Sequence, residues 1–488
     1  MSALIVVDNP QRWPFEIPGV AVTSGRDYLT DPRYSEDRSL KVFNLCRSYR
    51  YQTVGYYVSL LAEARGHKPL PNASTIQDLK SQHVIRSLSE EVDDVVQRAL
   101  KPLRSSSFTL SIYFGQNMAK RYARLALWLF NLFPVPMLRA RFTLSEGRWD
   151  LQWIRPIATS DIPDGHRKFV VQAAAAYFTR GKRVRRRAAA RFDIALLRNP
   201  LDPQAPSNER ALARFEKAAE AVGLDLEFID RDDFARIAEF DALFIRETTA
   251  VNHHTYRFSR RAVAEGLVVI DDPASIVKCS NKVYLHELME RHGVPTPKTL
   301  IVHRGNVDSI RRELGLPVVL KQPDSAFSLG VTLAEDERAL DEAVSALLDK
   351  SDLIIAQEFV PTEFDWRVGV LDQRPLYVCR YYMARRHWQI IHRDEHGRTG
   401  EGDADTLTIG EAPEEVVRLA VKAANLIGDG LYGVDLKQIG RRCVVMEIND
   451  NPNIDAGTED RILKDALYRE VMGVFLKRIE ARKARAGR

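Results

Sequence analysis

Two apolar runs near the end of the chain, Leu431 to Leu436 and Cys443 to Ile448, flank a short polar stretch from Lys437 to Arg442. Apolar runs of this length, separated by a polar link, predict two strands joined as a hairpin. Side chains two positions apart point to the same face of a strand, so Glu447 and Asn449 should lie together. The pattern therefore predicts a strand pair that carries polar side chains on one face.

Between about residues 190 and 275, short apolar runs alternate with amphipathic segments that end at glycine. Alternation of this kind predicts a small parallel sheet with right-handed crossovers. The polar run Arg246 to Thr249 would lie at the sheet edge where ligands bind, or it is an ordinary polar loop. The predicted strands are Phe192–Arg198, Leu224–Ile229, Ala242–Arg246 and Leu267–Ile270, and the predicted helices are Asn208–Val222, Phe234–Glu239 and His253–Glu265.

Residues 1 to about 185 show a similar mixture of apolar runs and helical periodicity, which predicts a separate α/β unit. The run Arg47 to Gln52 precedes a glycine and a helix, so it is either a ligand-binding strand edge or a helix start with exposed arginines. The predicted strands are Ala3–Val7, Lys41–Cys46, Phe108–Phe114, Met137–Leu144 and Trp149–Ile154, and the predicted helices are Gly55–Gly66, Arg121–Asn131 and Arg167–Thr179.

Beyond the parallel sheet, the pattern predicts a helix from Val283 to His292, stopped by a glycine and two prolines, and then further strands. One strand, Leu316 to Lys321, ends in a lysine before a loop of small residues. Such a lysine suits a phosphate clamp, since an ammonium and backbone N–H groups can face the same anion, although a surface hairpin fits the pattern too. The next strand, Leu353 to Phe359, could pair with a purine edge while Glu363 or Asp365 takes ribose hydroxyls.

Oxygen-bearing side chains interrupt both strands of the C-terminal hairpin. Asp435 lies in the first strand, and Glu447 and Asn449 lie in the second. Hard oxygen donors brought together in this way suit Mg²⁺, which binds few protein ligands and completes its shell with water and phosphate. The alternative is an antiparallel strand pair whose acidic side chains face water.

The chain has 488 residues, of which 45% are hydrophobic and 28% charged, so it can bury large cores in about three folding units. Its longest apolar candidate, Leu125 to Leu138, is interrupted by asparagine and proline, so no membrane span is predicted. The N-terminus is typical of a strand and shows no basic leader. The cysteines Cys46, Cys279, Cys379 and Cys443 form no CxxC pair, so no cysteine zinc site or disulfide framework is indicated. These features favour a cytoplasmic protein.

The net charge of +5 is modest, and much of it falls in two basic stretches, residues 180–191 and 477–488. Contact with RNA or with an acidic protein tail would use such stretches. A solvated linker and a terminal helix explain them as well. Because no aromatic residue interleaves either stretch, binding of a single nucleic-acid strand is disfavoured.

Six short segments occur in a recognisable order, namely Asn281–Lys282, Pro317–Lys321, Ala356–Val360, Asp365–Arg367, Gly433–Asp435 and Met446–Pro452. Together they resemble the ATP-grasp carboxylate–amine ligases of the RimK type, a branch that includes the ribosomal-protein glutamate ligase. The resemblance covers roughly residues 190 to 475, and the first unit is similar to an N-terminal domain fused to some RimK-like proteins. The implied α/β architecture is an N-terminal α/β domain at 1–185, a pre-ATP-grasp parallel-sheet domain at 190–275, and an ATP-grasp domain at 276–488 whose subdomains, 276–355 and 356–488, clasp ATP.

The resemblance implies an enzyme that uses ATP and Mg²⁺, with Mn²⁺ as a substitute, to join an amino acid or peptide amine to a carboxylate. The γ-phosphoryl group would pass to the carboxylate, and the amine would displace phosphate from the acyl phosphate under a lid formed by residues 324–330. The implied residues are Lys282, Lys321, Ser328, Gly330, Gln357, Glu358, Phe359, Val360 and Asp365 for ATP, Asp435, Glu447 and Asn449 for two metal ions, and Arg367 and Arg380 for gripping the acyl phosphate or the substrate carboxylate.

The chain departs from this family in two places, the lid and the segment that usually lines the acceptor site. The lid is poor in glycine, and the segment Trp388 to His396 stands where many relatives have an asparagine followed by two glycines. His387, His392 and His396 would either assist amine deprotonation or belong to a polar loop. The carboxylate partner is accordingly open between an acidic protein or peptide tail and a small metabolite. The alternative function is an inactive nucleotide-binding regulatory or scaffold protein, and a homo-oligomer is expected because relatives commonly form one.

Overall fold

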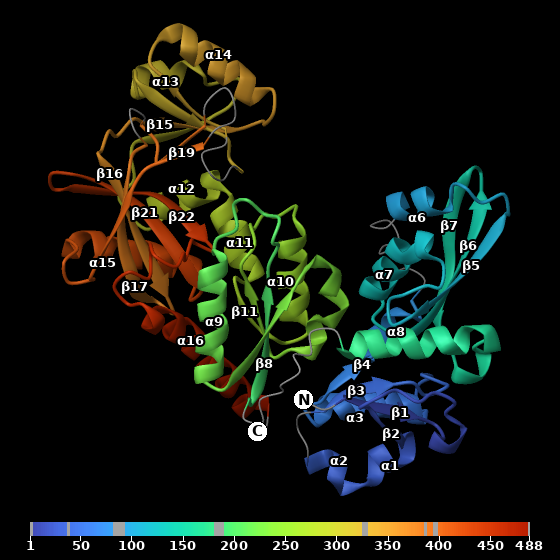
Figure 1. Ribbon diagram of the computed structural model, residues 1–488. Helices are drawn as coiled ribbons and strands as arrows, with labels where there is room; N and C mark the ends of the chain where they lie inside the picture. Colours follow the sequence, from blue (N-terminus) through green and yellow to red (C-terminus); the bar gives the residue numbers. More distant parts are fainter. Residues whose placement is uncertain are drawn as a thin grey trace. The chain divides into compact units, whose positions relative to one another are not determined.

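The computed structural model describes residues 3–36, 40–81, 93–179, 190–324, 330–384, 388–393 and 399–486. Most of the basic stretch 180–191 lies outside these residues. The chain divides into two compact units that both mix helices and strands, so the predicted α/β class is confirmed (Figure 1). The first unit is Met1–Ala188 with Ile229–Asp241, and the second is Ala189–Phe228 with Ala242–Arg488.

The first unit begins with a four-stranded parallel sheet in the order β2-β1-β3-β4. Strand β1 is buried from Leu4 to Val7, as expected for a parallel strand covered on both faces. The elements of this part are β1 (Ala3–Val7), β2 (Ala21–Ser24), β3 (Lys41–Asn44), β4 (Lys68–Leu70), α1 (Gly25–Thr30), α2 (Pro32–Glu36), α3 (Val54–Ala64), α4 (Ala73–Asp78) and the 3-10 helix η1 (Pro10–Arg12).

An antiparallel meander, β5-β6-β7, forms the second sheet of this unit. One hydrophobic core joins it to the parallel sheet, with Phe43 of β3 packed edge-on against Tyr177 and Phe178 of α8. Within the same core lies Ala235, from the segment 229–241. The elements are β5 (Ser107–Tyr113), β6 (Met137–Ser145), β7 (Arg148–Pro156), α6 (Asp93–Leu100), α7 (Ala123–Leu132), α8 (Arg167–Thr179), η2 (Lys120–Tyr122), η3 (Thr159–Asp161), η4 (Asp164–His166) and η5 (Arg231–Glu239).

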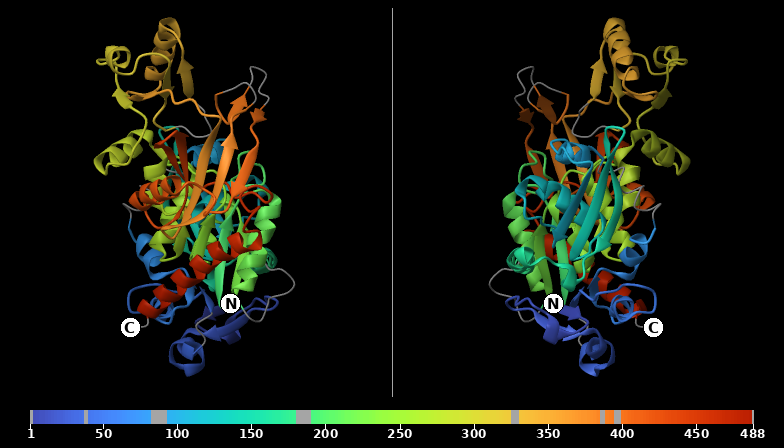
Figure 2. Two further views of the ribbon diagram at one scale, coloured as in Figure 1. Left: turned by 90° about the vertical axis from the view of Figure 1, so that its left-hand side faces the viewer. Right: turned by 90° about the vertical axis from the view of Figure 1, so that its right-hand side faces the viewer.

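The second unit begins with the predicted parallel sheet, whose strand order is β9-β8-β10-β11 and in which β8, β10 and β11 pair in parallel. Helix α9 lies beside the C-terminal helix α16 (Figures 1 and 2), and Phe215 of α9 packs edge-on against Tyr468 of α16. The elements are β8 (Phe192–Leu197), β9 (Leu224–Ile229), β10 (Ala242–Ile245), β11 (Val268–Ile270), α9 (Glu209–Ala221), α10 (His254–Ala264), α11 (Pro273–Ser280) and α16 (Asp465–Ala486).

The two parallel sheets are an internal repeat, because β2-β1-β3-β4 has the same topology as β9-β8-β10-β11. The elements that follow start 200 positions apart, with α3, β4 and α4 at 54, 68 and 73 and α10, β11 and α11 at 254, 268 and 273. A buried hydrogen bond is repeated as well. The hydroxyl of Ser59 donates to the carbonyl of Pro71, and that of Ser259 donates to the carbonyl of Asp271, both at 2.7 Å. Between residues 54–78 and 254–278, the identical pairs at this offset are Tyr56 and Tyr256, Ser59 and Ser259, Ala62 and Ala262, Ala64 and Ala264, Gly66 and Gly266, and Ile76 and Ile276.

The repeat predicts equal structural roles for its two serines. We expect Ser59→Ala and Ser259→Ala each to destabilise its own unit by about 1–3 kcal/mol, because a buried carbonyl loses its donor. Hydrogen exchange measured peptide by peptide should increase over residues 54–70 in the first variant and over 254–270 in the second. Each variant is the control for the other, and an increase spread evenly over both regions would contradict the assignment.

The C-terminal part of the second unit holds two antiparallel sheets, β12-β15-β13-β14 and β20-β17-β16-β21-β22. The predicted hairpin is confirmed, but β21 (Leu431–Ile439) and β22 (Arg442–Asp450) are longer than predicted and leave only Gly440 and Arg441 between them. Lys437 therefore lies in a strand and not in the polar link. The other elements are β12 (Thr299–Val302), β13 (Val318–Lys321), β14 (Val331–Ala334), β15 (Ile354–Glu358), β16 (Phe364–Leu371), β17 (Arg374–Tyr382), β18 (Ile391–Arg393), β19 (Thr399–Glu401), β20 (Ala404–Leu407), α12 (Lys282–Arg291), α13 (Asp308–Glu313), α14 (Glu337–Leu348) and α15 (Glu414–Ile427).

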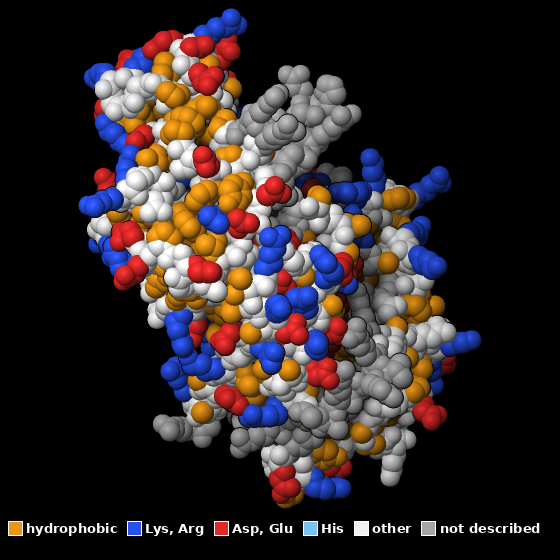
Figure 3. Space-filling model, turned by 60° about the vertical axis from the view of Figure 1, so that its left-hand side comes forward, with side chains coloured by type: hydrophobic (Ala, Val, Ile, Leu, Met, Phe, Trp, Pro, Cys, Tyr) orange, Lys and Arg blue, Asp and Glu red, His pale blue; other side chains and the backbone are white. Residues whose placement is uncertain are grey.

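The surface carries both signs of charge. Lysine and arginine side chains lie interspersed with acidic ones on the face in Figure 3, which fits the modest net charge of the chain. The four cysteines are buried free thiols. Among the described residues, no helix has the length and apolar character needed to cross a membrane.

Candidate functional site

Strands β16, β21 and β22 are neighbours in the C-terminal sheet (Figure 1). They carry a row of polar side chains on one face of this sheet. The register places Arg367 opposite Asp435 and Asp435 opposite Glu447, and directly opposed residues share a face. Asn449 lies two positions beyond Glu447 and therefore points to the same face. Gly433 opposes Asn449, and a Cβ at this glycine would lie 2.7 Å from a proline ring. The row thus ends where two backbone segments approach closely.

Each carboxylate in this row is paired with a cation. Nε and Nη2 of Arg367 donate to the two carboxylate oxygens of Asp435 at 2.6 and 2.7 Å, and Asn449 Nδ2 donates to Asp435 at 3.1 Å. Lys282 Nζ donates to Glu447 Oε1 at 2.8 Å. Burial by itself would raise the pKa of Glu447, but the charge and hydrogen bond of Lys282 outweigh it and hold that pKa below its usual value. Glu447 is therefore ionised near neutral pH.

A pocket next to this row is lined from α12, β13, β15 and β22. Lys321 Nζ donates to Gln357 Oε1 at 2.7 Å, and Gln357 Nε2 donates to Thr299 Oγ1 at 2.9 Å. The pocket contains two ammonium groups, a carboxylate that can ligate a metal ion, and apolar side chains. A nucleoside polyphosphate needs cations beside its phosphates and an apolar surface beside its base, so it suits this pocket. The lining residues are Lys282, Leu285, His286, Met289, Thr296, Thr299, Lys321, Ile355, Gln357, Val445, Met446 and Glu447.

We expect ATP binding to weaken as the pH rises through about 8. Burial lowers the pKa of Lys321 to about 8, Glu447 opposes this effect, and the charges of Lys282 and Lys437 add to it. Because only the protonated lysine attracts phosphate, ATP affinity should fall about tenfold between one unit below and one unit above that pKa. Lys321→Arg should largely abolish the pH dependence, since a guanidinium stays protonated throughout. Titration calorimetry at several pH values checks this, and an equal slope for wild type and variant would contradict it.

Lys437 belongs to the same face, although the sequence pattern assigned it to a loop. It follows Asp435 by two positions on β21, and its Nζ donates to Asp365 Oδ1 at 2.6 Å and to Thr362 Oγ1 at 2.7 Å. Asp365, which was expected to bind ribose, is thus held in an ion pair. Continuing the period-two alternation past Leu436 is the signal that would have placed Lys437 in the row.

The expected adenine hinge is only partly directed at the pocket. Gln357 lines it, whereas the next residue, Glu358, is turned to Arg442, which donates to its two carboxylate oxygens at 2.8 and 2.7 Å. These hydrogen bonds lower the pKa of Glu358 to about 2. Neighbouring side chains on a strand point to opposite faces, which explains the difference. Phe359 packs edge-on against Trp388 with 6.0 Å between ring centroids, and Val360 is buried.

Gly330 lies at the end of the expected lid. Its φ is +71°, its carbonyl accepts from the backbone N–H of Gln322 at 3.0 Å, and a Cβ there would lie 2.6 Å from the Gln322 side chain. Only glycine fits this position without strain. Ser328 and the middle of the lid lie outside the described residues, as do His387 and His396, while for His392 only the backbone of β18 is described.

Arg380 is not brought to the polar row. It opposes Trp366 on β16, so it shares the face of Trp366 and not that of Arg367, which is one position further along the strand. Its guanidinium donates to Asp405 at 3.1 Å and lies over the ring of Phe364 at 5.4 Å. The two arginines singled out from the sequence therefore occupy opposite faces of one sheet.

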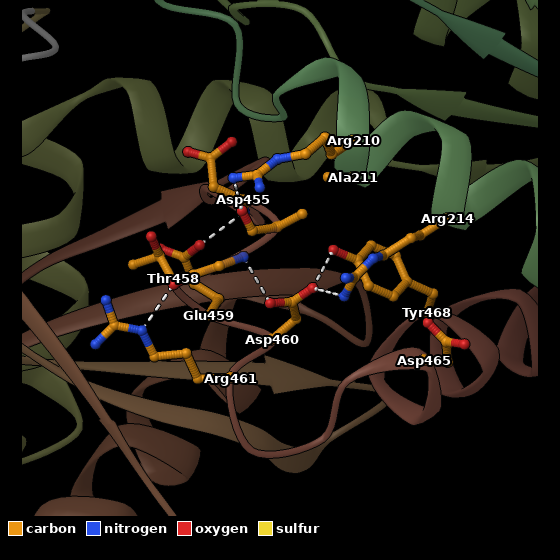
Figure 4. A network of polar contacts seen from close by, with 12 residues as sticks. Arg210, Ala211, Arg214, Asp455, Thr458, Glu459, Asp460, Arg461, Asp465 and Tyr468 are labelled. Atoms are coloured by element: carbon orange, nitrogen blue, oxygen red, sulfur yellow. Dashed lines mark hydrogen bonds and ion pairs between the residues drawn. The ribbon is translucent and has the colours of Figure 1, made fainter.

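The segment after β22 is fixed by buried polar contacts. Arg246, which follows β10 and is 1% exposed, donates to Asn451 Oδ1 at 2.8 Å. Further along the segment, Asp460 accepts from the hydroxyl of Tyr468 at 2.9 Å and pairs with Arg214 of α9 (Figure 4). The end of β22, where the polar row lies, is thereby tied to the parallel sheet and to both of its neighbouring long helices.

Two family models match the chain. Residues 25–173 match the RimK-like ATP-grasp N-terminal domain, and residues 279–465 match the RimK-like ATP-grasp domain. The second range contains every segment that carried the resemblance seen in the sequence, and the first covers most of the first unit. The resemblance is therefore confirmed.

The chain is similar to curated relatives and to a solved structure. A protein named probable alpha-L-glutamate ligase from a Marinomonas strain is 25% identical over 284 residues, which cover 55% of this chain and 90% of that protein. One of the same name from Teredinibacter turnerae is 27% identical over 291 residues, with the same two coverages. The crystal structure of a RimK-domain ATP-grasp protein from Sphaerobacter thermophilus is 17% identical, with a TM-score of 0.44, and covers 58% of this chain and 98% of that one.

Proposed function

Because the chain belongs to the RimK-like ATP-grasp proteins and is an ATP-dependent ligase by family, we propose that it joins an amino acid or peptide amine to a carboxylate with ATP and Mg²⁺. The observation that carries this proposal is the pocket shared by Lys282, Lys321 and Glu447, next to the row that contains Asp435. Cations for phosphate and oxygen donors for a divalent ion occur there side by side.

The chemistry follows from the poor leaving group of a carboxylate. Transfer of the γ-phosphoryl group to the carboxylate oxygen breaks the terminal phosphoanhydride bond, releases ADP and forms an acyl phosphate. The amine then attacks the acyl carbon, the C–O bond to phosphate breaks, and an amide, phosphate and a proton are released. Most of the rate enhancement would come from positioning and from neutralising charge on the phosphoryl oxygens.

Each site residue has a role in this scheme. Lys282 and Lys321 would hold the phosphates, and Arg367 would grip the acyl phosphate or the substrate carboxylate through its planar guanidinium. Asp435, Glu447 and Asn449 present the oxygen donors that Mg²⁺ prefers. The bound ions would supply further neutralisation of the phosphates. The carboxylates of Glu447 and Asp435 already pair with the cationic groups of Lys282 and Arg367. This part of the site therefore favours positive charge beside these carboxylates, and the residues present fit a divalent cation.

For the substrates, the names of the curated relatives suggest L-glutamate as the first amine to test. The carboxylate would come from a peptide, a protein tail or a small metabolite. An acidic tail would give the basic residues 477–488 a use, whereas a small metabolite would need only the closed pocket.

The experiment is phosphate release with ATP and Mg²⁺ across a panel of amino acids, dipeptides and acidic-tailed peptides, followed by mass spectrometry of the products. We expect ADP and phosphate in equal amounts. We also expect the mass of one carboxylate partner to increase by the amount that one amide bond to the amine adds. Phosphate release without a new amide, in the presence of every partner that binds, would contradict the ligase proposal.

A further inference from the structure

Three metal-type side chains gather at the end of β10, away from the ATP pocket. Glu247 lies two positions after this strand, and His253 and His254 begin α10. Their ligand atoms all lie within 4.8 Å of one another. The cluster stands at the carboxyl edge of a parallel sheet, where the alternation in the sequence had placed the polar run Arg246 to Thr249.

Glu247 is the unusual member of this cluster. It is 1% exposed, and within the described part of the chain its Oε2 has no hydrogen-bond partner. Its Oε1 is 2.9 Å from Nε2 of His254, yet that nitrogen makes no aligned hydrogen bond to any described residue. A buried carboxylate oxygen without a hydrogen-bond partner is unfavourable unless a cation faces it. The arrangement therefore points to a cation that both atoms face.

The internal repeat shows that the fold does not require these side chains. By strand register the position equivalent to Glu247 in the first unit is Cys46, two residues beyond β3, and by the helix starts those equivalent to His253 and His254 are Thr53 and Val54. The repeat keeps what packing needs, such as the buried serine hydrogen bonds, but it keeps none of the three ligand types. The cluster is accordingly a property of the second copy and not of the topology.

We propose that Glu247, His253 and His254 bind a zinc-class divalent cation. Two imidazoles and one carboxylate form a donor set that Zn²⁺ prefers, with bonds of about 2.0–2.2 Å, and three protein ligands leave one position open. His253 Nδ1 is hydrogen-bonded to Thr255 Oγ1 at 3.1 Å, which is the kind of contact that orients a ligating ring.

A hydrogen bond joins the proposed cation site to the end of β22, although the site contains no residue of that strand. Asn451 Nδ2 donates to the backbone carbonyl of Glu247 at 2.7 Å, and Asn451 follows Asn449 of the polar row by two positions. A cation held by Glu247 would therefore fix the loop 247–253 against the end of β22. This inference goes beyond the proposed function, because it concerns a nitrogen-ligated ion and not the oxygen-ligated Mg²⁺.

The test is zinc binding by the full chain, after chelator treatment and in the presence of excess Mg²⁺ to fill the oxygen sites. Titration against a chromophoric zinc chelator should show one more zinc per chain in wild type than in a His253→Ala, His254→Ala variant. Glu247→Gln should weaken that site at least about tenfold. Co²⁺ should give the intense visible bands of a four-coordinate ion with wild type only.

His292→Ala is the matched control, because His292 is an exposed histidine that lies outside the cluster, and it should bind zinc as wild type does. His254 is partly exposed, so His254→Ala is a milder second variant whose fold can be checked by thermal unfolding. Equal zinc stoichiometry and affinity in wild type and in folded cluster variants would overturn the proposal. Because zinc binding is measured without substrates, this outcome is independent of whether the ligase reaction is observed.

Discussion

Glu447→Gln should lower kcat by more than about a hundredfold while the protein remains folded. The substitution keeps the size of the side chain but removes a carboxylate that lines the proposed ATP pocket and belongs to the polar row. It also removes the partner of Lys282, whose ammonium is 2.8 Å from Glu447. Steady-state phosphate release with the authentic substrates, together with thermal unfolding, measures the two effects separately.

A matched control is Asp372→Asn, which likewise removes an acid held in ion pairs, here with two cations. Asp372 contacts Arg478 and Lys477 at 2.8 and 3.0 Å, in the turn between β16 and β17. Its φ of +47° suits asparagine, so no backbone strain is introduced. Turnover of this variant should stay within about twofold of wild type. Near-normal turnover by Glu447→Gln would show that the metal assignment is wrong.

Arg367→Ala should both inactivate and destabilise the second unit. Asp435 and Arg367 are 14% and 18% exposed and share two hydrogen bonds, so truncation of the arginine strands a buried carboxylate. Loss of one partner of such a pair costs about 3–5 kcal/mol. Turnover should fall at least about a hundredfold, because the guanidinium that would grip the oxyanion is lost. Denaturant unfolding and phosphate release report these quantities.

A double variant separates the effect of this ion pair on stability from its effect on turnover, since it removes both Arg367 and the proposed metal ligand Asp435. Arg367→Met combined with Asp435→Leu replaces the ion pair by apolar side chains of similar length, which is often neutral for stability. We expect the free energy of unfolding to return to within about 1–2 kcal/mol of wild type while turnover stays lost. Recovery of turnover along with stability would mean that Arg367 supports the fold and takes no part in catalysis.

Much of the fold could be predicted from the sequence because hydrophobic runs and glycine stops mark its strands and helices. The hairpin around Asp435 and Glu447 and the parallel sheet near β10 are of this kind. The repeat could not be seen in the same way. Only six identical positions between residues 54–78 and 254–278 support it, most of them small or buried, and Cys46 stands at the position of Glu247. Shared burial and topology reveal it, and both belong to the folded chain.

The sequence predicted which residues form the candidate site better than it predicted which residues they contact. Alternation along β22 placed Glu447 and Asn449 on one face, and the register of three strands added Asp435 and Arg367. Partners across strands are not encoded in any local pattern. The pairing of Lys437 with Asp365, the turn of Glu358 toward Arg442 and the opposite face of Arg380 all depend on register.

The assignment of residues 229–241 to the first unit has a consequence for experiments that delete the N-terminal region. Glu239 in this segment is buried, pairs with Lys41 at 3.1 Å and accepts from the Tyr177 hydroxyl, and Ala235 lies in the same core. A shortened chain that starts near residue 190 would keep the segment but lose these partners and the core around Ala235, so the segment would lose its native packing. Inactivity of such a chain would then report misfolding, and substitutions at exposed residues such as Arg47 are the sounder way to ask what the N-terminal region contributes.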